Sequence, residues 1–440
     1  MYHDRRGIAL TTRNAASLPH LDAAVTSFLS HRRDTPAHLE AAFAEDPDLA
    51  VAHAFSGFLA LLLGRAELFP EARLALQRTQ ASLARRGGTA RERGLADALA
   101  CWCEGEMELA ADRLDEMLAT NPLDALTAKL VQSLRFMLGD ADGMRRSVET
   151  ILPAWSETVP GYGFVLGCHA FALEETGELA AGEHAGRLGL EYENRDVWGC
   201  HAVAHVHEAR GALGAGIAWI AAHADRWNSV NNFARHMDWH RALLHFARSE
   251  TERVVEIYDR QIRDVRTDDY RDITNAASLL YRLEATGIDV GRRWAELADL
   301  AERRLNDRAL VFAQLHYMLC LVGDRRWDAA YRLFGAMDIE ARVGQGTQAR
   351  LLADLGVPLA KTLLASFGAD RKAATSAAVT LRSDVSRLGG SHAQRQTFER
   401  ILRVAEEQQR QSSPHPATLR GDAHRSPPRR TQLAALALAR

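Results

Sequence analysis

The chain has 440 residues, of which 47% are hydrophobic and 25% charged, a composition typical of a folded protein rather than a disordered one. Its formal net charge of −3 supplies no general basic field, so we expect no nucleic-acid partner. No apolar run reaches the roughly eighteen residues of a membrane span, and the N-terminus lacks the apolar core of a signal peptide. Five cysteines without paired CxxC spacing favour reduced thiols, and the sequence therefore predicts a soluble cytoplasmic protein that does not bind membranes.

Residues 1–17 form an N-terminal segment, after which apolar side chains recur every three or four positions, the helical period. In residues 95–125 the pattern places Leu95, Leu99, Trp102 and Met107 on one helix and Ala110, Leu114 and Leu118 on the next. Short turns with Gly or Asp separate partner helices, and Asp-Pro, Asn-Pro or Leu-Pro pairs end them. These turns are predicted at Gly64, Gly105, Gly139, Gly177, Gly211 and Gly323.

The spacing of Ala98, Ala110, Leu114 and Pro122 matches the 34-residue tetratricopeptide unit, in which small residues let two helices approach closely. The corresponding small positions in the next recognisable unit are Gly182, Gly186 and Gly189. We therefore predict an all-α fold over residues 18–408: stacked antiparallel helix pairs forming a degenerate tetratricopeptide-like α-solenoid, with at most two short strands. Residues 409–440 are rich in Pro and Arg and are predicted to be a flexible tail with a short C-terminal helix.

Histidines gather in the middle of the chain, where seven of the 18 fall within residues 201–245, against about two for an even spread. Residues 198–210 are predicted to form a helix on which His201, His205 and Glu208 share one stripe. A second helix, predicted over residues 232–247, repeats the four-residue spacing with His236 and His240. If the two helices are neighbours, the ring nitrogens of the two pairs should converge.

Three roles fit this pattern of histidines, and the sequence leaves all three open. Imidazoles four residues apart can bind a metal such as zinc or iron, with a carboxylate as a further ligand or base. Metal-free imidazoles can act as general acid and base, since histidine titrates near neutral pH. The third role is structural, with the rings satisfied by hydrogen bonds at an interhelix joint.

We assign candidate roles on this basis. The candidate metal ligands are His201, His205, His236 and His240. The candidate catalytic residues are His205, His240 and Glu208. The candidate ligand-binding residues are His201, His236, Trp239, Asp272 and His316, although Asp272 alone reads as a helix-start acid and His316 as a core histidine.

Several segments resemble the tetratricopeptide repeat protein 38 family in order and spacing over nearly the whole chain. They include MRRSVETILPAW (144–155), HAVAHVHE (201–208), HMDWHRALLH (236–245), LLYRLEATGIDVGRRW (279–294) and LGGSHAQRQTF (388–398). The resemblance implies a helical tetratricopeptide-like fold in a soluble protein, and it marks a set of histidines and one acid. These are His201, His205, His207, His236, His240, His316 and Asp272. The chain departs from the family's pattern at Met237 and Gln314, where the family commonly has Asn and Asp.

Two functions follow as hypotheses. In the first, a His-rich pocket binds a metal ion or small polar ligand and supports hydrolase- or lyase-type catalysis. In the second, the concave face of the helical repeats holds a protein or peptide partner without catalysis, and the histidines are structural. The concentration of histidines in the middle of the chain favours the first hypothesis, a binding pocket.

Overall fold

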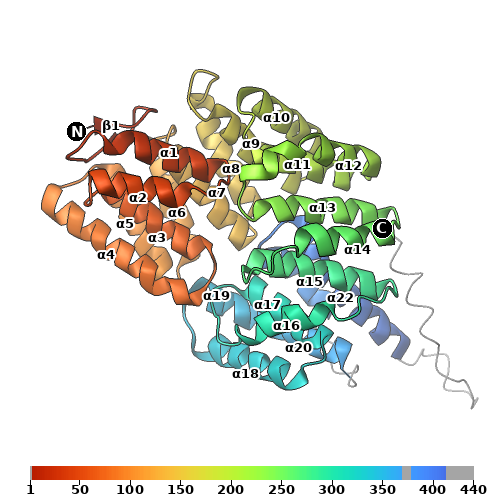
Figure 1. Cartoon of the computed structure of the whole chain (residues 1–440). Helices are drawn as coiled ribbons and strands as arrows, with labels where there is room; N and C mark the ends of the chain where they lie inside the picture. Colours follow the sequence, from red (N-terminus) through yellow and green to blue (C-terminus); the bar gives the residue numbers. More distant parts are fainter. Residues whose placement is uncertain (1, 369–377, 413–440) are drawn as a thin grey trace, which may run out of the picture. The chain divides into compact units, whose positions relative to one another are not determined.

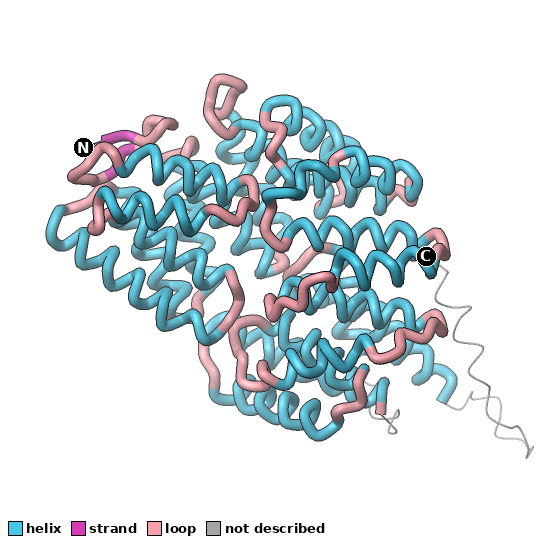
Figure 2. The backbone as a smooth tube through the Cα atoms, in the orientation of Figure 1, coloured by secondary structure: helices cyan, strands magenta, loops and turns pink. Residues whose placement is uncertain are grey.

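The computed structural model describes residues 2–368 and 378–412, and within these ranges the protein is almost entirely helical (Figure 1). The described strands are β1 (Tyr2–His3) and β2 (Ala9–Leu10), which are magenta in Figure 2. They form an antiparallel pair with Tyr2 opposite Leu10. The all-α prediction, with at most two short strands, is confirmed for this part of the chain. Nothing described is a helix long and apolar enough to cross a membrane.

The chain divides into two compact units. The first comprises residues 1–265 with the short segments 345–348 and 389–391, and the second comprises the remainder. The helices of the first unit are α1 (Ser17–Leu29), α2 (Thr35–Glu45), α3 (Ala50–Leu62), α4 (Phe69–Arg86), α5 (Ala90–Cys103), α6 (Met107–Thr120), α7 (Ala125–Leu138), α8 (Ala141–Ile151), α9 (Tyr162–Glu175), α10 (Leu179–Tyr192), α11 (Val197–Ala209), α12 (Leu213–Ala222), α13 (Phe233–Ala247) and α14 (Thr251–Ile257).

The second unit contains α15 (Tyr270–Ala285), α16 (Arg293–Glu302), α17 (Val311–Gly323), α18 (Trp327–Val343), α20 (Val357–Phe367), α21 (Ala378–Asp384) and α22 (His392–Ser412), and α19 (Gly346–Leu351) begins in the first unit and ends in the second.

Short non-α helical turns occur in both units: η1 (Ala66–Leu68), η2 (Leu152–Ala154), η3 (Ala224–Ser229), η4 (Tyr258–Ile262), η5 (Leu352–Gly356) and η7 (Val385–Leu388). The predicted tail begins at residue 409, but α22 continues to Ser412. Residues 413–440, where the C-terminal helix is predicted, lie outside the described residues.

Consecutive helices of the first unit pack against each other as pairs, from α1 with α2 through α9 with α10 to α13 with α14. Glycines at the predicted turns of this unit adopt positive φ, as Gly105 (89°) and Gly177 (87°) do, which lets the chain reverse directly after a helix. In the second unit Gly323 instead ends α17, and Arg325 adopts the positive φ. One detail of the sequence reading was wrong. Met107 does not share a helix with Trp102, because α5 stops at Cys103 before the Gly105 turn and Met107 is the first residue of α6.

Close approach of α10 to its neighbours sets the position of the histidine-bearing helix α11. A methyl group added to Gly186 would lie 2.7 Å from the Val203 side chain and 3.0 Å from the Gly199 carbonyl oxygen on α11. At Gly189, the added methyl would lie 2.9 Å from the Gly163 carbonyl oxygen on α9. The small positions predicted from the repeat pattern are therefore contacts between backbones, and no larger residue fits there without displacing a helix.

Candidate metal centre

The four candidate ligands come from two helices that begin and end within one residue of their predicted bounds, α11 and α13. Asp196 caps α11, since its carboxylate accepts a hydrogen bond from the Gly199 backbone N–H. One turn separates the two histidines of each pair, so both rings of a pair project from the same face. The prediction that the two faces meet is confirmed, because the four rings offer ligand atoms that all lie within 4.8 Å of one another.

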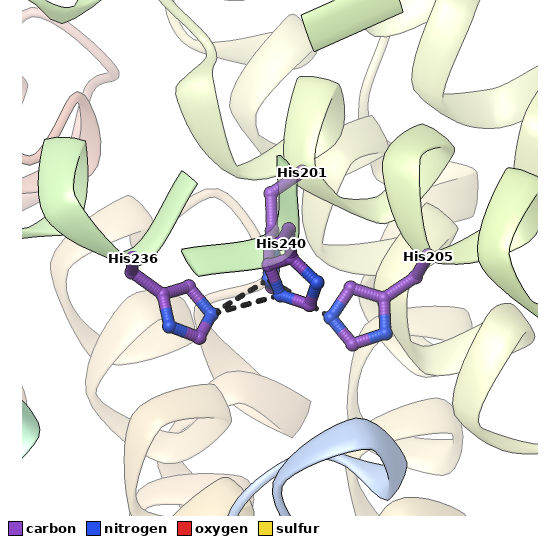
Figure 3. A group of neighbouring side chains, drawn as sticks. All are labelled: His201, His205, His236 and His240. Carbon is purple, nitrogen blue, oxygen red and sulfur yellow. Dashed lines mark hydrogen bonds between the residues drawn. The ribbon is translucent and has the colours of Figure 1, made fainter. Parts of the chain in front are cut away.

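The Nε2 atoms form the centre of this group (Figure 3). The Nε2 atom of His201 lies 2.9 Å from that of His205, 3.0 Å from that of His236 and 3.1 Å from that of His240. The Nε2 atoms of His236 and His240 are also 3.1 Å apart. Three of the four rings are buried, with exposed fractions of 1% for His201, 3% for His205 and 1% for His240, and His236 is half-buried.

Hydrogen bonding alone cannot satisfy the triangle formed by His201, His236 and His240. Each contact needs one nitrogen that carries a proton and one that presents a lone pair, and each neutral Nε2 is one or the other. Around three mutually contacting atoms this alternation fails, so at least one edge joins two donors or two acceptors. A cation bound to all of the Nε2 lone pairs removes the conflict, because every nitrogen then faces the same positive charge.

Carboxylates contact the outer nitrogens of two of these rings. The Nδ1–H of His240 donates to Glu208 Oε2 at 3.2 Å, and Glu174 Oε2 on α9 lies 3.5 Å from Nδ1 of His205. A proton held on Nδ1 leaves the Nε2 lone pair of the neutral ring directed into the cluster. Carboxylate–histidine–metal chains of this kind orient the ligand and raise its basicity at metal sites. Nδ1 of His201 is buried without a hydrogen-bond partner.

Burial favours the uncharged form of His201. The pKa of His201 lies well below its ordinary value because the ring is desolvated and because His205, His240 and His236 would repel its charge. A neutral imidazole is the form that binds a metal, so the environment prepares His201 for ligation at neutral pH.

Aromatic side chains surround the rings. Trp239, with no exposed surface, stacks on His236 with ring centres 5.3 Å apart and packs against His240 at 4.8 Å. Trp198 and Phe171 lie 5.0 and 5.5 Å from the ring of His201. This shell lowers the local dielectric, which strengthens the interaction of a bound ion with its ligands.

Other histidine-family positions have different surroundings. His207 faces α12, where its backbone-side methylene is near Gly216, and Met237 is fully buried in an apolar cluster with Ala204, Ile220 and Leu244. The departure at Met237 therefore concerns a core position and not the face that carries the imidazoles.

Asp272 and His316 belong to the second unit. Asp272 lies in the first turn of α15 and accepts a hydrogen bond from the Thr267 hydroxyl. The His316 ring donates from Nδ1 to the Phe312 carbonyl oxygen at 2.8 Å and packs between Phe312 and Phe398, and burial lowers its pKa to about 4. Asp272 thus has a partner in the loop before its helix and His316 one within its own helix, and their roles in ligand binding stay predictions.

Sequence reasoning missed Glu174. It is buried with 7% exposure near the end of the otherwise apolar helix α9, and it contacts His205 from a helix outside the two histidine stretches. The only signal in the sequence is a pair of acids, Glu174 and Glu175, directly after an apolar helical run.

No family model matches the chain.

Proposed function

We propose that the protein binds one transition-metal ion through the Nε2 atoms of His201, His205, His236 and His240. The observation that supports this most is the largely buried triangle of the Nε2 atoms of His201, His236 and His240, with edges of 3.0, 3.1 and 3.1 Å, which hydrogen bonds between neutral imidazoles cannot satisfy. Glu208 and Glu174 support it independently, because they approach the nitrogens that face away from the centre.

The donor set narrows the choice of ion. Four imidazoles suit zinc, iron, copper, cobalt and nickel, whereas calcium and magnesium prefer oxygen ligands. A structural interhelix joint fits less well, since apolar residues at these positions would avoid the cost of unpaired polar atoms, about 1–3 kcal/mol for each. We extend the proposal to hydrolase- or lyase-type chemistry on a small polar substrate, in which the ion would activate water or polarise a carbonyl group.

The resemblance to the tetratricopeptide repeat protein 38 family forms part of the same proposal. The family's histidine positions include all four proposed ligands, so metal binding here would make the same set a candidate site in the relatives. The pairing of consecutive helices supports the tetratricopeptide-like reading of the chain.

Elemental analysis of the purified full-length protein tests metal binding. We expect close to one equivalent of a transition metal in the wild type, and loss of it in His201→Ala and in His240→Ala. His184→Ala is the matched control, because His184 is exposed on α10 outside the cluster, and it should retain the ion. If the wild type, after incubation with zinc, iron(II), cobalt, nickel and copper in turn and removal of free ions, retains none of them, the proposal fails.

A further inference from the structure

The separations between the Nε2 atoms carry information about the angles at a bound ion. A metal ion lies about 2.0–2.1 Å from each histidine nitrogen, so two nitrogens at a right angle are about 2.9 Å apart and two at the tetrahedral angle about 3.3 Å apart. The measured separations are 2.9, 3.0, 3.1 and 3.1 Å. The separations of 2.9 and 3.0 Å match neighbouring corners of an octahedron or square pyramid, and those of 3.1 Å lie midway between the two values, so the set as a whole is closer to the right angle than to the tetrahedral angle.

The positions of the rings agree with this geometry. In Figure 3, His236 and His205 reach the centre from opposite sides, and His201 and His240 lie between them. The ring of His205 lies beside those of both His201 and His240, with ring centres 4.4 Å apart in each case, and its Nε2 atom contacts that of His201. In an octahedral arrangement, His236 and His205 therefore occupy opposite corners, and His201 and His240 occupy two adjacent ones.

We infer that the bound ion keeps two adjacent coordination positions, opposite His201 and opposite His240, and that these take a chelating oxygen anion. The inference rests on the proposed function, since it requires the ion to be bound. Among the described residues, the four histidines form one group of possible ligand atoms, and His205 also belongs to a second group with Glu174 and Glu175. Glu208 and Glu174 contact Nδ1 atoms, which lie behind the imidazoles, so these two carboxylates stand outside the inner sphere.

The charge of the site selects the class of ligand. Four neutral imidazoles bring no negative charge to the ion, and the carboxylates of Glu208 and Glu174 act on it only across the rings of His240 and His205. An anionic ligand with two oxygens in adjacent positions, such as a hydroxamate, a 2-hydroxy acid or a 2-oxo acid, fills both positions and partly neutralises the charge. A closed tetrahedral zinc site of structural type would offer no such position.

Cobalt(II) substitution of the full-length protein tests the inference, because tetrahedral cobalt(II) absorbs visible light strongly and five- or six-coordinate cobalt(II) absorbs weakly. We expect weak bands that shift in a saturable way on titration with acetohydroxamate, with one equivalent bound and the cobalt retained. His184→Ala should give the same titration.

Each other outcome contradicts a defined step. Strong bands that acetohydroxamate leaves unchanged would show a closed tetrahedral site and overturn the inference while metal binding stands. Weak bands that do not change on addition of acetohydroxamate would refute the two open coordination positions, since the ion would then have no exchangeable site. If cobalt and the other ions all fail to stay with the protein, the proposed function itself is wrong.

Discussion

Replacing His240 with alanine separates a ligand site from a structural joint. The ring of His240 is 1% exposed, and its Nε2 atom lies 3.1 Å from those of His201 and His236. Its Nδ1–H donates to Glu208 at 3.2 Å. The change therefore removes one donor to the ion, one hydrogen bond to a carboxylate and one corner of the triangle that hydrogen bonds cannot satisfy.

The expected magnitudes differ with and without metal. Without an ion, the lost bond to Glu208 and the new cavity cost about 1–3 kcal/mol, and release of the unsatisfied triangle offsets part of this. We therefore expect a net loss of about 1–2 kcal/mol. With free ion at 100 times its dissociation constant, binding stabilises the wild type by about 2.7 kcal/mol, and the variant should lose most of that increment.

Denaturant unfolding followed by tryptophan fluorescence measures both quantities, since Trp198 and Trp239 contact the histidines. Each protein is unfolded in chelator and again in excess ion. A small difference in chelator with a large difference in ion supports the ligand site. A loss above about 3 kcal/mol in chelator, together with no stabilisation of the wild type by any ion, would refute the reasoning and assign the cluster to an interhelix joint.

Three further predictions concern the surroundings of the site. Glu208→Gln and Glu174→Gln should each weaken ion affinity about 10- to 100-fold in a chelator competition. Glu183→Gln is the control, because Glu183 forms ion pairs with Arg side chains, and it should keep the wild-type affinity. Equal affinities in all three variants would show that Glu208 and Glu174 do not contribute to ion binding. Gly186→Ala should destabilise the protein by about 1–3 kcal/mol in denaturant, and an unchanged midpoint would mean that α10 can move away from α11. Burial raises the pKa of Asp196 from 3.8 to about 7, so its ionisation opposes folding, and stability should fall as pH rises from about 4 to about 7. Asp196→Asn keeps the helix cap and should lose this part of the pH dependence. Unfolding midpoints of both proteins across that pH range test the prediction, and identical pH profiles would contradict it.

The sequence by itself determined the helices and the stripes on their surfaces. The helix predicted over residues 198–210 is observed at Val197–Ala209, and the one predicted over 232–247 at Phe233–Ala247. Helical period, caps and turn glycines act between residues a few positions apart, so they can be read locally. The four-residue spacing of His201 with His205, and of His236 with His240, likewise determined that each pair shares a face.

Only the tertiary structure decided which helix faces meet and which carboxylates contact the outer nitrogens of the histidines. The contact of Glu174 with His205 depends on the packing of α9 against α11, and that packing depends on the close approach at Gly186 and Gly189. The orientation of His205 and His240, with Nε2 inward and Nδ1 toward a carboxylate, also follows from contacts between helices. Such contacts join residues about 30 positions apart, and no local pattern encodes them, because the free energy that selects one packing is summed over the whole core.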